Sequence, residues 1–203
     1  MKIYLTRHGE TKWNVEGRLQ GSKDSPLTKK GIEDAKALGH RLSKVDLDVI
    51  YSSTSPRAMI TAEIIRGKRN IKIIQMDALK EMDTGDWQGR TLKEIEKNHP
   101  QEYHNYWNSP HLYRAANGGE KFNQVQRRAI AVIKDIINEK RYQSILIISH
   151  GVTLKSIITY YQGKPIERIW DPPIIRGGSL SLMEAYGNDI AIPFLGDISH
   201  IED

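Results

Sequence analysis

Two histidines in the chain have similar neighbours. His8 lies between Arg7 and Gly9, and His150 is followed by Gly151; each histidine lies just beyond a predicted strand that contains a short apolar run. The planar guanidinium of Arg7 suits a phosphate or carboxylate, and a glycine lets the backbone approach a ligand closely. One such histidine can be a hydrogen-bonded structural group, a metal ligand or a nucleophile. The recurrence of the pattern favours a functional pair.

Arg57 is a further candidate for binding an anion. Ser55-Pro56 predicts the start of a helix, with the serine as its cap and the proline in its first turn, so that Arg57 falls in that turn. The free amides and the dipole at a helix start already favour an anion, which makes a cation unfavourable there unless an anion binds. The alternative is a surface arginine whose stem packs over Tyr51 or Met59. Position alone leaves both interpretations open.

The candidate carboxylates lie in a glycine-punctuated acidic stretch at residues 79–89. It contains Glu81, Asp83 and Asp86 beside Trp87. A loop of this composition can fold over a pocket and partly desolvate one acid, which suits that acid to proton transfer. Spacing alone does not choose among the three.

A metal centre is the competing interpretation of the histidines. No third ligand with a recognisable spacing accompanies His8 and His150, so we expect no metal. Three other histidines lie in a polar stretch and are expected to be solvated: His99, His104 and His111.

Apolar periodicity predicts the elements that must position these side chains. Strands are expected at 2–6, 48–52, 71–75, 144–149, 179–184 and 190–194. Helices are expected from 29 to about 42 with Thr28 as cap, from 56 onward, within 91–110, at 120–139 and at 152–161. The alternation indicates an α/β fold, a three-layer α/β/α sandwich with a mostly parallel central sheet. Ligands bind at the carboxyl ends of such strands, where His8, Arg57 and His150 would converge.

The length of 203 residues suits a single domain over residues 1–203. Residues 80–119 are expected to form an insertion and acid loop that cover the site. This insertion is helical in pattern and rich in aromatic residues. We expect at least half of its large side chains to pack against the sheet and the others to line a permissive pocket; they are Tyr103, Tyr106, Trp107, Leu112 and Tyr113.

Composition limits the remaining function classes. The net charge of +5 comes from lysines and arginines scattered among acidic residues, without a dense basic run, so nucleic acid is not an expected partner. The chain has no cysteine, which excludes disulfides and a cysteine nucleophile. No segment has the length of a membrane span or a signal peptide, so we expect no membrane partner and a cytoplasmic location.

The motifs taken in order resemble the histidine phosphatase superfamily, the phosphoglycerate mutase-like proteins. The likeness covers nearly the whole chain. Its parts are RHGET at residues 7–11 with Asn14, GRLQG at 17–21, DSPLT at 24–28 with Gly31, SSTSPRA at 52–58, the loop at 81–89, GGE at 118–120 and SHG at 149–151. One RHG triplet is weak, whereas the ordered set is specific.

The resemblance implies roles for individual residues. His8 would be the nucleophile that forms a phosphohistidine, which water then hydrolyses. Arg7, Arg57 and His150 would surround the phosphoryl oxygens, and Glu81 would give a proton to the leaving oxygen. No cofactor or metal is implied. Substrate-binding positions would be Asn14, Gln20, Gly21 and Gly151.

The superfamily contains mutases and phosphatases, and the sequence favours a phosphatase. The mutases carry a Glu-Arg-His-Tyr-Gly type sequence at the acid loop and paired arginines beyond it; here the loop reads EMDTG at 81–85, and Arg114 is the only arginine within 91–119. The pattern is most similar to the bacillary broad-specificity phosphatases. This implies hydrolysis of small phosphorylated metabolites, 3-phosphoglycerate included. The alternatives are a phosphoglycerate mutase, a dedicated phosphatase such as one for ribazole phosphate, and a non-catalytic phosphate-binding protein; the oligomeric state is not predicted.

Overall fold

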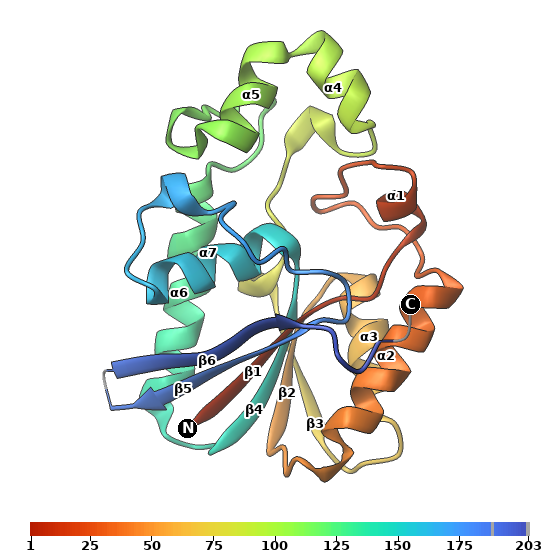
Figure 1. Ribbon diagram of the computed structural model, residues 1–203, viewed down its shortest axis with the longest axis vertical. Helices are drawn as coiled ribbons and strands as arrows, with labels where there is room; N and C mark the ends of the chain where they lie inside the picture. Colours follow the sequence, from red (N-terminus) through yellow and green to blue (C-terminus); the bar gives the residue numbers. More distant parts are fainter. Residues whose placement is uncertain (188, 202–203) are drawn as a thin grey trace.

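A six-stranded sheet in the order β3-β2-β4-β1-β5-β6 forms the centre of the computed structural model, which describes residues 1–187 and 189–201 (Figure 1). The neighbours among β1 to β4 are parallel, whereas β5 pairs antiparallel with β1 and β6 antiparallel with β5. The predicted α/β class with a mostly parallel sheet is confirmed. The strands are β1 Lys2–Arg7, β2 Val49–Ser53, β3 Lys72–Met76, β4 Ser144–Ser149, β5 Leu180–Tyr186 and β6 Asp189–Asp197.

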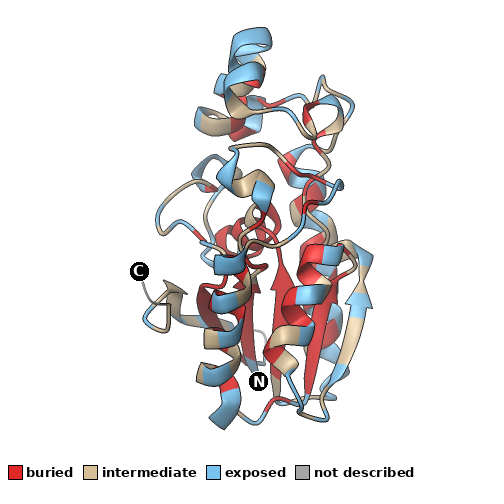
Figure 2. Cartoon of the chain, turned by 90° about the vertical axis from the view of Figure 1, so that its right-hand side faces the viewer, coloured by how far each residue is buried: buried red, intermediate tan, exposed pale blue. Residues whose placement is uncertain are grey.

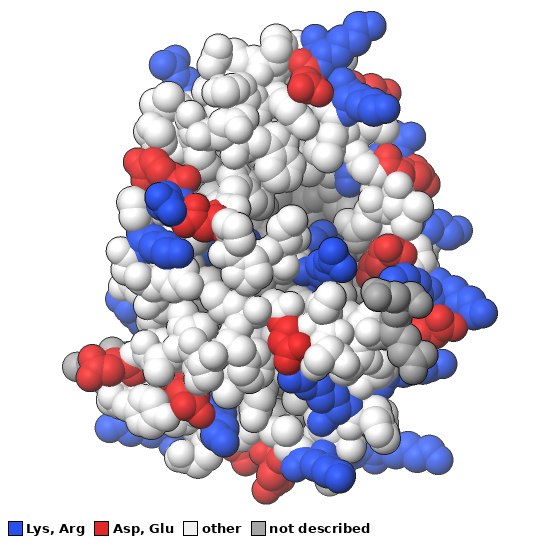
Figure 3. Space-filling view, in the orientation of Figure 1, with Lys and Arg blue, Asp and Glu red and all other residues white. Residues whose placement is uncertain are grey.

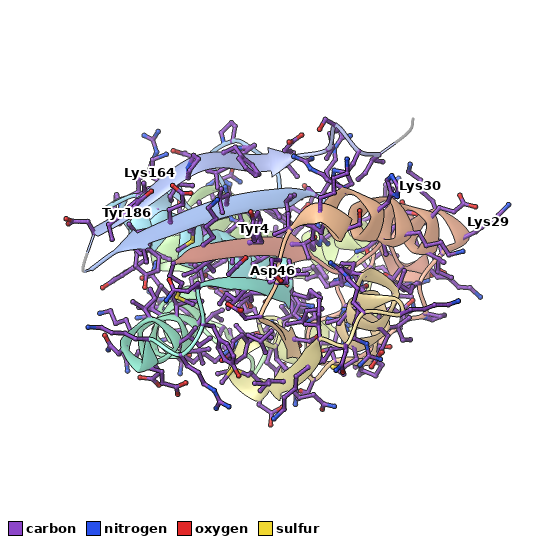
Figure 4. All side chains as sticks on the ribbon, turned by 90° about the horizontal axis from the view of Figure 1, so that it is seen from below. Tyr4, Lys29, Lys30, Asp46, Lys164 and Tyr186 are labelled. Atoms are coloured by element: carbon purple, nitrogen blue, oxygen red, sulfur yellow. The ribbon has the colours of Figure 1, made fainter. Side chains whose placement is uncertain are left out.

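Helices cover both faces of this sheet, as Figure 4 shows from below, with α6 on one side and α2 and α3 on the other. The α-helices are α1 Lys12–Val15, α2 Lys29–Arg41, α3 Pro56–Arg66, α4 Leu92–Asn98, α5 Pro100–Asn108, α6 Phe122–Glu139 and α7 Gly151–Tyr161. The short 3-10 helices are η1 Leu42–Lys44, η2 Asp77–Leu79, η3 Gly85–Trp87, η4 Pro110–Leu112 and η5 Ile166–Arg168. Among these described helices, none is long and apolar enough to cross a membrane.

The alternation of side chains along the strands explains the three layers. On β4, Ile145 and Ile147 belong to the core that α6 and α7 cover, whereas Leu146 and Ile148 belong to the core under α2 and α3. Both sets are fully buried, as a parallel strand with helices on both sides requires. Figure 2 shows the same concentration of buried residues in the sheet and the helices that face it.

Two helix starts test the local predictions. Thr28 caps α2 as predicted, because its side chain accepts a hydrogen bond from the backbone amide of Gly31. Ser55 occupies the N-cap position of α3 as predicted, but its side chain makes no capping bond, and its hydroxyl instead accepts a bond from Ser53. Pro56 occupies the first turn, where its fixed φ suits a helix and its missing N–H is not needed.

The residues at 80–119 carry α4, α5 and η4 and lie beyond the carboxyl ends of the parallel strands (Figure 1). They surround a third apolar cluster in which Trp87, Tyr106, Tyr113 and Phe122 are buried. The prediction that at least half of the named side chains pack against the sheet is wrong: Tyr103, Tyr106, Trp107 and Tyr113 pack in this cluster, whose other members come from loops and from helices such as α6 and α7 and from no strand. The single domain over residues 1–203 stays a prediction; residues 188 and 202–203 lie outside the described residues.

Candidate active site

The predicted site residues converge at the carboxyl edge of the sheet. Arg7 ends β1 and is in register with Ser149 at the end of β4, so the two histidine-glycine turns are neighbours. The rings of His8 and His150 have their centroids 5.0 Å apart. Arg57 comes from the first turn of α3, directly after β2. Residues more than 140 positions apart in the sequence therefore meet in one place because their strands are adjacent.

His8 is held as a neutral imidazole with one nitrogen left to react. Its Nδ1 lies 2.8 Å from the carbonyl oxygen of Gly9, so Nδ1 carries the hydrogen. Its Nε2 accepts the Nε hydrogen of Arg57 at 3.2 Å, which requires a lone pair on Nε2. Burial, followed by the charges of Arg57 and Arg7, lowers the pKa of His8 well below 6.5. This is the protonation state that a histidine nucleophile needs.

Arg57 is the most connected group of the site, with 1% of its surface exposed. All its N–H groups point at acceptors: Nε at His8, Nη1 at the Lys23 carbonyl and the Asp24 carboxylate, and Nη2 at the Gly21 carbonyl and Nδ1 of His150. The alternative of a surface arginine packed over Tyr51 or Met59 is therefore wrong. The position of Arg57 at the start of a helix gave no indication that the loop at residues 21–24 encloses its side chain.

His150 binds the guanidinium of Arg57 through a hydrogen bond. It is fully buried, and Nδ1 accepts a hydrogen bond from Arg57 at 3.1 Å while Nε2 donates to Ser53 Oγ at 2.8 Å. Burial, followed by the charge of Arg57, lowers the pKa of His150 well below 6.5. The direct contact of His150 with a phosphoryl group stays a prediction, because this side chain does not line the cavity at His8.

Arg7 offers an unused donor to the site. Its Nη1 donates to the carbonyl of Ile175 at 3.2 Å, whereas its buried Nε has no hydrogen-bond partner within the described residues. Burial lowers the pKa of Arg7, and the nearby carboxylate of Glu81 opposes that effect. An unpaired buried donor is costly, so an anion bound here would satisfy it.

Among the three candidate acids, Glu81 alone lines the cavity. Its carboxylate accepts the backbone amides of Met82, Val152 and Thr153, at distances of 2.9 to 3.3 Å, two of which belong to the start of α7. Asp83 accepts hydrogen bonds within its own loop. Asp86 is exposed. The choice that spacing left open thus falls on Glu81.

The cavity above His8 has a volume of about 80 Å³. It opens in the hollow between the helical insertion and the sheet in Figure 3, with lysine and arginine side chains at its margin. Of the predicted substrate-binding positions, Asn14, Gln20 and Gly21 line it, and the buried Oε1 of Gln20 has no partner among the described residues. Gly151 lies beside the cavity: a Cβ there would be 3.6 Å from Arg7 Cζ and Glu81 Oε2.

Sequence reasoning missed several residues of this cavity. They are Arg18, Leu19, Met82 and Thr84, and Tyr106 was named only as one of several aromatics. Most come from irregular loops, where periodicity gives no orientation. By contrast, the predicted solvation of His99, His104 and His111 is confirmed, since all three are exposed. Within residues 1–187 and 189–201, no group of three or more histidine, cysteine or acidic side chains is placed to hold a metal ion.

The two buried histidines predict a dependence of stability on pH. The unfolded chain binds protons at these residues as the pH falls through about 6.5, whereas the lowered pKa values of His8 and His150 keep both neutral in the folded protein. The free energy of unfolding should therefore decrease below pH 6.5, by up to about 1.4 kcal/mol per pH unit for each histidine. Urea unfolding between pH 7 and pH 5 measures this. His150→Asn should show a shallower decrease, and a flat profile for the parent protein would contradict the assignment.

Comparison with known proteins narrows the identity. The family model described as histidine phosphatase superfamily (branch 1) matches residues 3–198. The solved structure of Bacillus stearothermophilus YhfR is 46% identical, covers 99% of both chains and has a TM-score of 0.96. An alpha-ribazole phosphatase structure from Shigella flexneri is 30% identical with a TM-score of 0.88, covering 98% of this chain and 97% of its own. The metal-independent phosphoserine phosphatase of Arabidopsis thaliana is 34% identical over 77% of this chain and 66% of its own length.

Two of these relatives are phosphatases by name, and the family match over residues 3–198 together with these identities shows that the present chain is a phosphatase. More narrowly, the chain belongs to the histidine phosphatase superfamily. The predicted resemblance, with its likeness to the bacillary members, is confirmed, and so is the prediction of a phosphatase.

Proposed function

We propose that this enzyme hydrolyses small phosphomonoesters in two steps, with His8 as nucleophile. In the first step Nε2 of His8 forms a bond to phosphorus while the bond to the ester oxygen breaks, and the departing alcohol takes a proton from Glu81. In the second step water attacks phosphorus while the bond from phosphorus to His8 Nε2 breaks and its electron pair returns to Nε2; the carboxylate of Glu81 takes a proton from that water, and phosphate leaves. The observation that carries the proposal is the neutral imidazole of His8, whose Nε2 lone pair faces the buried guanidinium of Arg57.

The charges of the site fit the transition state of this transfer. Negative charge spreads over the equatorial oxygens of the transferred group, and fixed cations beside it supply most of the stabilisation. The Nε hydrogen of Arg57 that donates to His8 would turn to a phosphoryl oxygen as the lone pair attacks phosphorus. The unpaired Nε of Arg7 would donate to a second oxygen. The two arginines would supply this positive charge without a metal.

The lining of the cavity supports a broad choice of alcohols over a mutase. Apart from the proposed catalytic and substrate-binding residues, it includes Arg18, Leu19 and Tyr106, which differ in polarity. Arg114 is exposed and does not line the cavity. A mutase must hold its substrate's carboxylate while the phosphoryl group moves, and beyond Arg7 and Arg57 the described lining offers Arg18 alone rather than an arginine pair. Phosphoserine and ribazole phosphate, which the names of relatives suggest, are candidate substrates within this class.

The decisive experiment measures phosphate release in the presence of EDTA. We expect p-nitrophenyl phosphate, glycerol phosphate, 3-phosphoglycerate and phosphoserine to be hydrolysed at rates that excess chelator leaves unchanged. Loss of turnover with EDTA would contradict the mechanism. Conversion of 3-phosphoglycerate to 2-phosphoglycerate faster than phosphate release would instead establish a mutase. The cytoplasmic location stays a prediction.

A further inference from the structure

We infer that Arg128 is a positioning residue for the proton donor, and that it fixes the backbone around Glu81 together with Glu120. The inference rests on the proposed role of Glu81. Neither Arg128 nor Glu120 lines the cavity at His8. Both would affect the reaction indirectly, because they fix the backbone of the loop that carries Glu81.

Arg128 lies on α6 and reaches the acid loop through three carbonyl groups. Its Nη1 donates to the carbonyls of Ala78 and Lys80, each at 2.8 Å, and its Nη2 donates to the carbonyl of Glu81 at 3.0 Å. Ala78 lies within the short helix η2, and Lys80 and Glu81 follow it in a segment that has no helix or strand. One guanidinium therefore supplies the hydrogen bonds that regular structure supplies elsewhere.

Glu120 locks the arginine in this position. Its two carboxylate oxygens accept Arg128 Nε at 2.8 Å and Nη2 at 2.9 Å, the paired geometry that gives an arginine and a carboxylate directional specificity. Glu120 also accepts the amide of Asp83, and its own amide donates to the carbonyl of Asp83. Burial would raise the pKa of Glu120, but the bonds from Arg128 and Asp83 lower it overall, so the pair stays charged at neutral pH.

The two ends of Glu81 are thus held from different sides. Arg128 binds its backbone carbonyl, and the first amides of α7 bind its carboxylate. A general acid must come within about 3 Å of the leaving oxygen, and small misplacements of a catalytic group are costly. Loss of Arg128 would free the backbone of residues 78–81 while leaving His8 and Arg57 with all their contacts.

The dependence of rate on the leaving group tests this role. In Arg128→Ala we expect kcat/KM for glycerol phosphate to fall about 10-fold to 100-fold, because an alkoxide needs a proton as it leaves. For p-nitrophenyl phosphate, whose leaving group needs little help, the loss should stay below about threefold. The ratio kcat/KM is used because it reports only the steps up to alcohol release. An equal loss for both substrates would overturn the inference.

Matched variants separate the inference from the proposed function. Arg127→Ala removes the exposed neighbouring arginine on α6 and should leave both substrates unaffected. Glu81→Gln should show the same leaving-group pattern, and the double variant Glu81→Gln with Arg128→Ala should be no slower with glycerol phosphate than Glu81→Gln alone. If Glu81→Gln lacks the pattern, the acid assignment fails. If Glu81→Gln shows it and Arg128→Ala does not, only the role of Arg128 fails.

The inference can still be tested if Arg128→Ala does not fold. Thermal unfolding of each variant is measured first, and Arg128→Lys serves if the alanine variant does not fold. A lysine keeps the charge but not the planar fork that spans the carbonyls and Glu120. We expect Arg128→Lys to keep p-nitrophenyl phosphate hydrolysis within about twofold and to lose several-fold with glycerol phosphate. Parent-like rates with both substrates would contradict the positioning role.

Discussion

Replacement of His8 by alanine should reduce the rate of phosphate release by about 10⁵-fold or more, because hydrolases that lose a covalent nucleophile lose kcat by a factor of this order. The reason is specific to the bonding of this residue: its Nδ1 hydrogen is committed to the Gly9 carbonyl, which leaves Nε2 as the single reactive nitrogen. Rapid quenching of the parent enzyme with labelled substrate should trap an acid-labile, alkali-stable phosphate on the protein. His8→Ala should show neither turnover nor label.

The control for this variant is the integrity of the fold. His8 is almost fully buried, so its truncation leaves a small cavity next to Arg57. The thermal transition of His8→Ala should nevertheless remain cooperative, because the core strands on both sides of β1 are unchanged. A folded variant that retained label or turnover would assign the nucleophile to another residue.

Replacement of Arg57 by alanine should have the second largest effect, a loss of about 10³-fold in kcat. This side chain links the nucleophile, His150 and the loop at 21–24, and it would be the cation nearest the transferred group. The loss should appear with every substrate, whatever its leaving group, because charge on the phosphoryl oxygens is common to all. A profile of kcat over a series of aryl phosphates measures this.

Arg66 provides a matched control on the same helix. It ends α3 and pairs with Glu63, far from the edge of the sheet that carries the site. Arg66→Ala should keep the parent rate. Arg57→Lys should recover only part of the loss, because an ammonium cannot reach five acceptors with planar geometry. Parent-like turnover in Arg57→Ala would remove this residue from the proposed mechanism.

Much of the architecture could be predicted from the sequence, for identifiable reasons. The continuous apolar run at 145–148 indicates a strand buried on both faces, and its position in the middle of the sheet agrees with that. The strand-end positions of His8 and His150 were sufficient to predict that the two meet. These predictions need only local residue patterns and the general rule that the carboxyl ends of parallel strands lie at the same edge of a sheet. A single sequence is sufficient for both.

The remaining features depend on contacts between irregular segments. The enclosure of Arg57 by the carbonyls of Gly21 and Lys23 has no local signature, and its position at a helix start was equally compatible with a surface role. The hydroxyl of Ser55 had a competing partner in Ser53, which a cap prediction does not consider. The choice of Glu81 over Asp83 and Asp86 depended on where α7 begins relative to the loop.

The position of β1 within the sheet has a consequence for how the enzyme is made. This strand, at residues 2–7, lies between β4 and β5, whose residues are 144–149 and 180–186. A nascent chain emerges from the ribosome with its first residues leading, and pairings across such long separations form late because closing long loops costs entropy. His8 is thus translated well before the two strands that flank β1. A chain truncated before β4 would carry His8 and Arg57 without His150 and without either strand that flanks β1, so the site is completed only after residues 144–186 have been synthesised.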